Sequence, residues 1–159
     1  MRLAPREGGL SEIEVSGPNV FGGYLDRPEA TAEAFTGDGW FRTGDLGVLD
    51  DGYLPISGRA RELIITGGYN VYPREVEDVL RSHPGVADAA IAGRPSARWG
   101  ETVVAYVVAA DAVEAAALER ELAGWCAERL APYKRPRAWR WIGQVPRNPL
   151  GKVLRHELP

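Results

Sequence analysis

The stretch GRARELIITGGYNVYPREVE, residues 58–77, carries the clearest information about how this chain folds. Residues 63–66 form a β-prone run, and the pair Gly67-Gly68 follows them. An extended pattern then resumes, and Pro73 stands where the first turn of a helix would begin. Two glycines between extended runs favour a hairpin turn, and proline is favoured at the first helical position. The stretch therefore predicts a strand, a tight turn, a second strand and a helix.

The residues after this stretch alternate between helical and strand patterns. In a helix predicted for residues 73–82, Val76, Val79 and Leu80 have the spacing of a buried stripe. The run 102–109 is nearly all apolar, which indicates a strand buried on both faces. We expect an α+β domain, with a three-stranded sheet, covering helices and a two-stranded hairpin. The other elements predicted are strands at 86–92 and 139–142 and a helix at 114–130.

The residues before this stretch are dense in glycine, proline and aspartate. They predict short strands at residues 13–15, 21–24 and 39–41, and a helix that starts at Pro28. No complete apolar set for an independent core is visible among them. We therefore expect residues 1–57 to be the last portion of a larger domain or a β-rich subdomain.

Composition excludes several classes of protein. The chain of 159 residues is 45% hydrophobic and 26% charged, as in ordinary soluble globular proteins. Its net charge of -3 lacks the basic signature of a nucleic-acid-binding protein. No apolar run approaches the ~20 residues of a membrane span. The lone Cys126 fits a reducing compartment, so we expect a cytoplasmic protein, and its apolar helical surroundings favour a core role over a catalytic one.

Several residues could carry chemistry. Asp45 ends the motif FRTGD after a predicted Thr-Gly turn, and a carboxylate held there can accept two hydrogen bonds from a ribose diol. A lone aspartate in this setting more often caps the turn. Arg59 could reach ribose or phosphate oxygens, or form a surface salt bridge. Lys152 could supply a mobile positive charge for phosphate, or be a solvated lysine.

Other catalytic templates do not fit. Residues 143–152 resemble a P-loop only superficially, because Val153 replaces the required Ser or Thr. The chain has no GxSxG nucleophile motif. His83 and His156 lie far apart without a cysteine pair, so we expect no metal site on this chain.

The motifs become informative when they are taken together. FRTGD, GRARELIITGGYNVYPREVE, RLAPYKRP and VPRNPLGK occur in the order found in adenylate-forming acyl-CoA synthetases. The chain resembles the C-terminal part of these enzymes, whose superfamily includes luciferases and the adenylation domains of non-ribosomal peptide synthetases. Within it, ITGGYNVYP and PRNPLGK look most similar to malonyl-CoA and fatty acyl-CoA synthetases. The upstream segment SEIEVSGPNVFGGYLDRPEATAEAF also resembles the β-rich subdomain of the family.

The resemblance implies a two-step reaction that uses ATP, Mg²⁺ and coenzyme A. A small carboxylic acid attacks the α-phosphate of ATP to give an acyl-adenylate and pyrophosphate, and the thiol of CoA then displaces AMP. Asp45 matches the aspartate that holds the ribose hydroxyls, and Arg59 matches the arginine that assists it. Lys152 matches the lysine that contacts the α-phosphate and carboxylate oxygens during adenylation.

Gly68 matches the glycine that lines the pantetheine tunnel, with Gly67 and Tyr69 beside it. Arg94, Arg98 and Lys134 are candidates for contacts with the CoA phosphates, although solvated charges are the commoner role of such residues.

The resemblance also implies a domain organisation. Residues 1–58 would end the large AMP-binding domain, residues 59–61 would form a hinge, and residues 62–159 would be the small mobile domain. Arg61 falls at the hinge position, where the family usually has Asp or Lys, so how the hinge is held is left open. Rotation there would present Lys152 in the first step and Gly68 in the second.

The phosphate loop TSGTTGxPKG, the YGxTE segment and the acyl pocket of the family are absent from these residues. We therefore expect a C-terminal piece that binds nucleotide weakly and catalyses nothing measurable without the large domain. Two alternatives are a carrier-protein-loading adenylation domain and a non-catalytic binding module. Homo-oligomer formation is left open, and no nucleic-acid partner is expected.

Overall fold

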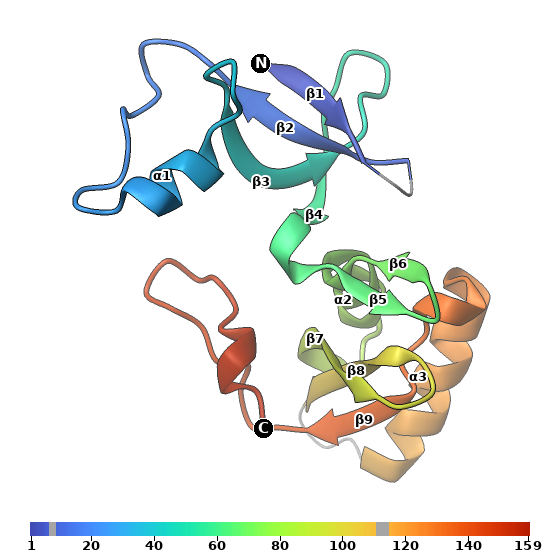
Figure 1. Cartoon of the computed structure of the whole chain (residues 1–159). Coiled ribbons are helices and arrows are strands. Elements are labelled where there is room, and N and C mark those ends of the chain that lie inside the picture. Colours follow the sequence, from blue (N-terminus) through green and yellow to red (C-terminus); the bar gives the residue numbers. More distant parts are fainter. Residues whose placement is uncertain (7–8, 111–114) are drawn as a thin grey trace. The chain divides into compact units, whose positions relative to one another are not determined.

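The computed structural model describes residues 1–6, 9–110 and 115–159, and these form two compact units. The first unit comprises Met1–Arg61 and the second Glu62–Pro159 (Figure 1). The short 3₁₀ helix η1, Ala60–Glu62, contains the boundary.

The first unit is a four-stranded antiparallel sheet in the order β1-β2-β3-β4, with one short helix. The strands are β1 Arg2–Pro5, β2 Ser11–Val15, β3 Phe41–Gly47 and β4 Ile56–Arg59, and the helix is α1 Pro28–Ala34. Among the described residues of this unit, the buried hydrophobic side chains are Ile13 and Leu46. So small a set agrees with the expectation that these residues lack an independent core.

Two of the strands predicted in the first unit are wrong or misplaced. Residues 21–24 are not a strand. The ring of Phe21 instead packs against those of Phe35 and Phe41, and the Tyr24 N–H donates to Thr31 Oγ1 at 2.9 Å, which forms a turn before α1. The strand predicted at residues 39–41 begins only at Phe41.

The second unit is built on a five-stranded sheet in the order β6-β5-β8-β7, with β9 parallel to β8. The hairpin of β5 and β6 joins this sheet through one pairing, between Thr66 and Gly100. Pro73 begins α2 as predicted, while the predicted start of the next helix at Glu114 lies outside the described residues. The elements are β5 Ile64–Thr66, β6 Tyr69–Val71, α2 Pro73–Arg81, β7 Val86–Ser96, β8 Gly100–Ala109, α3 Ala115–Arg129, η2 Pro132–Lys134, β9 Ala138–Trp141 and η3 Arg155–Glu157.

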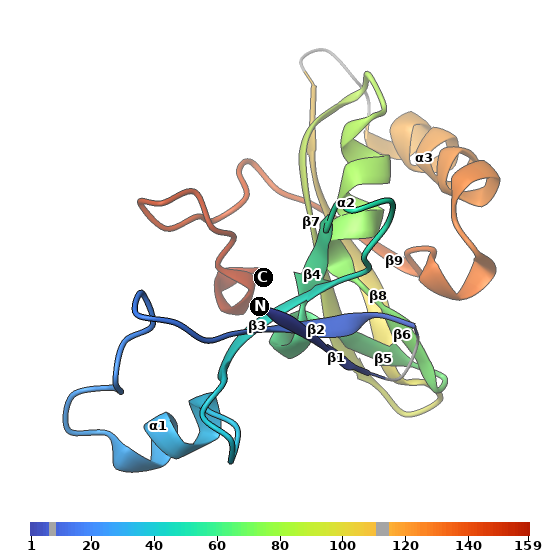
Figure 2. The same ribbon diagram turned by 90° about the horizontal axis from the view of Figure 1, so that it is seen from above.

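The central strand β8 contributes to a hydrophobic core on each of its faces. On one face, Val103, Ala105 and Val107 pack with side chains from α2 and α3, and we call this cluster the front core. Val104 and Tyr106 point to the opposite face and pack in a second cluster, which we call the back core. Figure 2 shows the two helices on one side of the sheet and the C-terminal segment on the other. The predicted burial of this strand on both faces is therefore confirmed. The C-terminal residues of the back core are Val145, Val153 and Leu158.

Candidate functional site

Asp45 and Arg59 are brought together in the first unit by the pairing of β3 with β4. Arg59 Nε lies 2.9 Å from Asp45 Oδ1. Thr43 Oγ1 accepts from the Asp45 N–H at 3.0 Å and donates to the Ile13 carbonyl at 2.7 Å. Asp45 therefore lies on a braced strand, which corrects the prediction of a turn at Thr-Gly. Gly44, with φ of 74°, supplies the local irregularity within that strand.

The Gly67-Gly68 turn in the second unit has a two-residue form, with φ of 57° and 83° at the two glycines. Positive φ at both central residues identifies the type I′ hairpin turn, for which glycine is favoured. The Gly67 N–H donates to the Trp99 carbonyl at 2.8 Å, and a Cβ at Gly67 would lie 3.0 Å from the Trp99 ring. A Cβ at Gly68 would meet no heavy atom within 4 Å among the described residues. The two glycines thus differ: one packs against an aromatic ring, and the other presents an open backbone.

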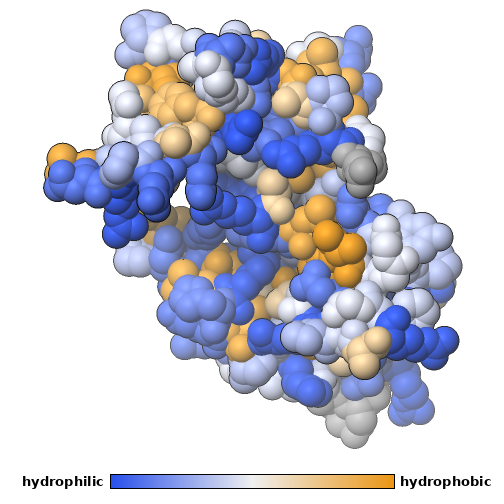
Figure 3. All heavy atoms as spheres, in the orientation of Figure 1, coloured by the Kyte–Doolittle hydropathy of each residue, from blue (hydrophilic) through white to orange (hydrophobic). Residues whose placement is uncertain are grey.

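Aromatic and cationic side chains surround this turn. Tyr69 stacks on Tyr133 with a centroid distance of 4.7 Å. The guanidinium carbons of Arg98 and Arg137 lie 4.7 Å and 4.3 Å from the Trp99 ring centroid. Figure 3 shows hydrophobic residues over β5, where Ile65 is exposed. This surface can stack a flat group and attract an anion. Sequence reasoning missed Trp99 and Arg137, although the run Arg98-Trp99-Gly100 could have indicated a stacking residue beside a cation.

The three cations predicted for CoA phosphates lie in different surroundings. Arg98 is exposed beside the turn. Lys134 Nζ contacts both carboxylate oxygens of Glu75, at 2.6 and 2.8 Å. Arg94 donates to Tyr106 Oη at 2.7 Å and to the Leu158 carbonyl at 2.6 Å, so its guanidinium holds the C-terminal segment. Of the three, Arg98 is the one that has an exposed side chain next to Trp99, the residue that contacts the turn.

Lys152 lies on a loop whose backbone is held by several hydrogen bonds. Asn148 Oδ1 accepts from the N–H groups of Leu150 and Lys152, at 3.0 and 2.9 Å. Arg147 donates to the Gly151 carbonyl at 2.9 Å and pairs with Asp88 of β7 at 2.8 Å. The Lys152 side chain is 51% exposed, and its Nζ lies 3.7 Å from Glu62 Oε1. The loop therefore presents an accessible ammonium group on a fixed backbone.

Asp88 is the acidic anchor of this loop. Burial acts to raise its pKa, but hydrogen bonds from Arg147, the Ala89 N–H and Arg81 outweigh burial and lower the pKa below its ordinary value. The carboxylate therefore remains ionised at neutral pH and keeps its contact with Arg147.

The candidate residues of the second unit fall into two places. Figure 1 shows the loop before η3 at one side of this unit and the β5–β6 turn at another. Among the described contacts, none joins Lys152 to Gly67 or Gly68. Arg61 is exposed at the end of the first unit. Within the described part of the chain, no group of three His, Cys, Asp or Glu residues could hold a metal ion, and no helix could span a membrane.

Comparison with known proteins agrees with these features. Residues 75–152 match the AMP-binding enzyme C-terminal domain. This chain carries the C-terminal domain of the AMP-binding enzymes. It is 48% identical over 153 residues to sulfoacetate–CoA ligase of Cupriavidus necator, a match that covers 96% of this chain and 30% of that enzyme.

Two solved structures also resemble this AMP-binding C-terminal domain and the unit before it. The o-succinylbenzoate CoA synthetase of Bacillus subtilis, in complex with its acyl-adenylate intermediate, has a TM-score of 0.83 and 44% identity. The match covers 93% of this chain and 30% of that one. ATP-bound MatB of Rhodopseudomonas palustris has a TM-score of 0.83 and 42% identity, over 96% of this chain and 30% of that one. This chain therefore spans about 30% of the length of the relatives it matches.

Proposed function

We propose that this chain is the C-terminal part of an ATP-dependent acyl-CoA ligase that adenylates a carboxylic acid and transfers the acyl group to CoA. The main support is the arrangement of the second unit, which carries an accessible lysine and an open glycine turn at two separate places. A domain built in this way can present a different surface to each of two half-reactions. Further support comes from the sulfoacetate–CoA ligase and the o-succinylbenzoate CoA synthetase named above, which match 96% and 93% of this chain.

In the adenylation step, a carboxylate oxygen bonds to the α-phosphorus of ATP and pyrophosphate leaves. The Lys152 ammonium would stabilise the negative charge that develops on the phosphate oxygens, a role in which a pre-positioned cation is effective. Asp45 would accept hydrogen bonds from the ribose hydroxyls, with Arg59 fixing the orientation of its carboxylate. Magnesium is proposed as part of the ATP substrate complex.

In the second step, the CoA sulfur bonds to the acyl carbon, the bond between that carbon and the AMP phosphate oxygen breaks so that AMP leaves, and the thiol proton passes to solvent. Gly68 would let the pantetheine arm pass close to the backbone, because no side chain blocks that position. Gly67 and Tyr69 would form the sides of this path. Arg98 is the best placed cation for a CoA phosphate, Lys134 would act only after leaving Glu75, and Arg94 is assigned to holding the C-terminal segment.

We propose that residues 59–61 connect the two units as a hinge, with Arg61 as the residue whose backbone angles change. A large AMP-binding domain would be the necessary partner and would supply the acyl pocket. The named relatives act on acids as different as sulfoacetate and o-succinylbenzoate, so the proposal specifies only a carboxylic acid. The proposal includes a cytoplasmic location, which the free thiol of Cys126 supports because such thiols are usual in reducing compartments.

The test replaces the matching part of the Bacillus subtilis o-succinylbenzoate CoA synthetase with these 159 residues. Pyrophosphate exchange with o-succinylbenzoate measures adenylation, and thioester formation from preformed adenylate measures transfer to CoA. We expect Lys152→Ala to abolish most of the exchange and spare the transfer. Gly68→Leu should block the transfer and spare the exchange, while Arg120→Ala, at an exposed position of α3, should change neither.

A folded chimera with no activity in either assay would count against the proposal. An equal loss of both half-reactions in Lys152→Ala would show that the lysine does not act in adenylation alone.

A further inference from the structure

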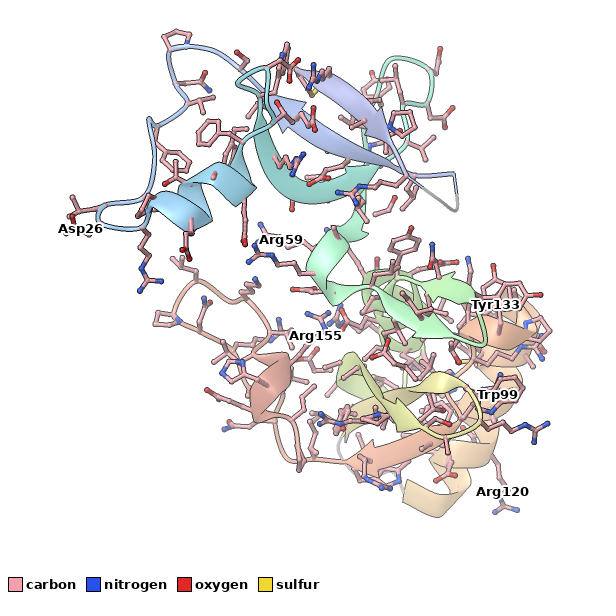
Figure 4. The ribbon with its side chains drawn as sticks, in the orientation of Figure 1. Asp26, Arg59, Trp99, Arg120, Tyr133 and Arg155 are labelled. Atoms are coloured by element: carbon pink, nitrogen blue, oxygen red, sulfur yellow. The ribbon has the colours of Figure 1, made fainter. Side chains whose placement is uncertain are left out.

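Arg155, three residues after Lys152, uses its guanidinium to join η3 to three other parts of the second unit. Its Nε donates to the Ile91 carbonyl of β7 at 3.0 Å, and one terminal nitrogen donates to Glu77 Oε1 of α2 at 2.7 Å. The other terminal nitrogen lies 2.8 Å from Glu62 Oε2. Figure 4 shows Arg155 on η3 in the second unit. A planar guanidinium can donate several hydrogen bonds in fixed directions at once, and the single ammonium group of lysine cannot reproduce this arrangement.

The contact with Glu77 fixes the arginine in place. Glu77 is only 4% exposed, and its Oε1 also accepts from the Ile91 N–H at 2.9 Å. A buried carboxylate requires partners, because leaving it unpaired is strongly destabilising. Arg155 is therefore part of the packed structure, while Lys152 on the same loop remains exposed.

Glu62 is shared between the two cations. Its Oε2 contacts Arg155 at 2.8 Å, within hydrogen-bond distance, whereas its Oε1 lies 3.7 Å from Lys152 Nζ, beyond that distance. Charge-assisted hydrogen bonds are the stronger class of ion contact. The ion contact of Glu62 with Arg155 is therefore stronger than its contact with Lys152, which constrains the lysine side chain only weakly.

We propose that Arg155 and Glu62 are positioning residues for Lys152, an inference that rests on the adenylation role proposed above for that lysine. Arg155 anchors the segment that follows the lysine and keeps the Glu62 carboxylate occupied. Glu62 makes only a weak ion contact with the ammonium group, and a phosphate can replace this contact. Because Glu62 follows Arg61 directly, this weak contact is made at the first residue after the proposed hinge.

Removal of Arg155 has a specific consequence in this scheme. Lys152 then becomes the main cationic partner of Glu62. The closer ion pair draws the ammonium group away from the position in which it would contact the α-phosphate. Neutralising Glu62 in the same protein releases the lysine again. A purely structural role for Arg155 predicts instead that thermal stability and both half-reactions fall together, and that neutralising Glu62 does not restore the exchange alone.

The first test uses the full chain labelled with ¹³C-lysine, because Lys134 and Lys152 are its two lysines. In Arg155→Gln, we expect the Cε order parameter of Lys152 to rise, and in Arg155→Gln with Glu62→Gln to return to the wild-type value or lower. Lys134, paired with Glu75, is the internal control. An unchanged or lower order parameter for Lys152 in Arg155→Gln would refute the scheme without reference to activity.

The second test measures the two half-reactions in the chimeric ligase. Arg155→Gln should slow pyrophosphate exchange about 10- to 100-fold, the range expected for a misplaced catalytic group, and leave transfer to CoA unchanged. Adding Glu62→Gln should raise the exchange rate of that variant about two- to five-fold, as expected for loss of one weak ion pair. Arg155→Lys should be intermediate, and Arg120→Gln should be silent.

Thermal unfolding of each variant separates loss of folding from loss of positioning. If Lys152→Ala leaves exchange intact, the proposed function fails. If Lys152→Ala abolishes exchange but Glu62→Gln does not rescue Arg155→Gln, the positioning scheme alone fails.

Discussion

The two glycines of the β5–β6 turn should respond differently to the same substitution. Both have positive φ, so alanine at either position adopts a left-handed conformation that costs about 1–2 kcal/mol. At Gly68 this is the whole expected cost, because the added Cβ meets no described heavy atom within 4 Å. At Gly67 the added Cβ lies 3.0 Å from Trp99, closer than an ordinary contact.

The Trp99 ring cannot easily give way, because the guanidinium groups of Arg98 and Arg137 both lie over it. Forcing an extra methyl group against a packed ring typically costs a further 1–3 kcal/mol or so. Gly67→Ala should therefore destabilise the domain by about 2–5 kcal/mol, and Gly68→Ala by about 1–2 kcal/mol. A domain of this size loses about 4–8 °C of Tm per kcal/mol.

The assay is thermal and urea unfolding of the full chain, followed by circular dichroism. Gly68→Asn is the matched control, because asparagine tolerates the left-handed region better than alanine does. It should unfold at a higher temperature than Gly68→Ala. Equal destabilisation by Gly67→Ala and Gly68→Ala would refute the reasoning, since it would mean that the contact with Trp99 imposes no cost.

Three further predictions concern the second unit. Leu80 is fully buried in the front core, so Leu80→Ala should lower the free energy of unfolding by about 2–5 kcal/mol in a urea titration. Burial raises the pKa of the Cys126 thiol to about 11, so a thiol reagent at pH 8 should label it only after unfolding, and rapid labelling of the native chain would contradict this. The lowered pKa of Asp88 gives a stabilising contribution that is present above about pH 3.8 and is lost as the pH falls through the folded-state value. Asp88→Asn should therefore flatten the dependence of the urea midpoint on pH between about 2 and 5.

The features that could be predicted from the sequence are those with a local chemical cause. The Gly67-Gly68 turn follows from the need for positive φ, and the start of α2 follows from the fixed φ of Pro73. The apolar run in β8 could be assigned to a doubly covered strand because a solvated face would show polar alternation.

The features that could not be predicted depend on residues far apart in the chain. The pattern of residues 21–24 predicted a strand, but the ring of Phe21 packs with those of Phe35 and Phe41 instead. Arg155 meets Glu77, 78 residues earlier, and no local pattern relates the two positions. The guanidinium group of Arg137 likewise reaches Trp99 because β9, which follows Arg137, pairs with β8, although α3 separates the two strands in the sequence.

The two cores on either side of β8 differ in how firmly their outer layers are attached. The front core is covered by two helices with their own internal hydrogen bonds, whereas the back core is covered by an irregular segment that contributes Val145, Val153 and Leu158. Segments with few buried apolar contacts open in local unfolding events at less than the global free energy. The C-terminal segment should therefore exchange its amide hydrogens before β7 and β8 do. The lysine proposed for catalysis thus lies on a segment that is held to the sheet mainly by side-chain contacts, so this segment can open locally while β7 and β8 stay folded.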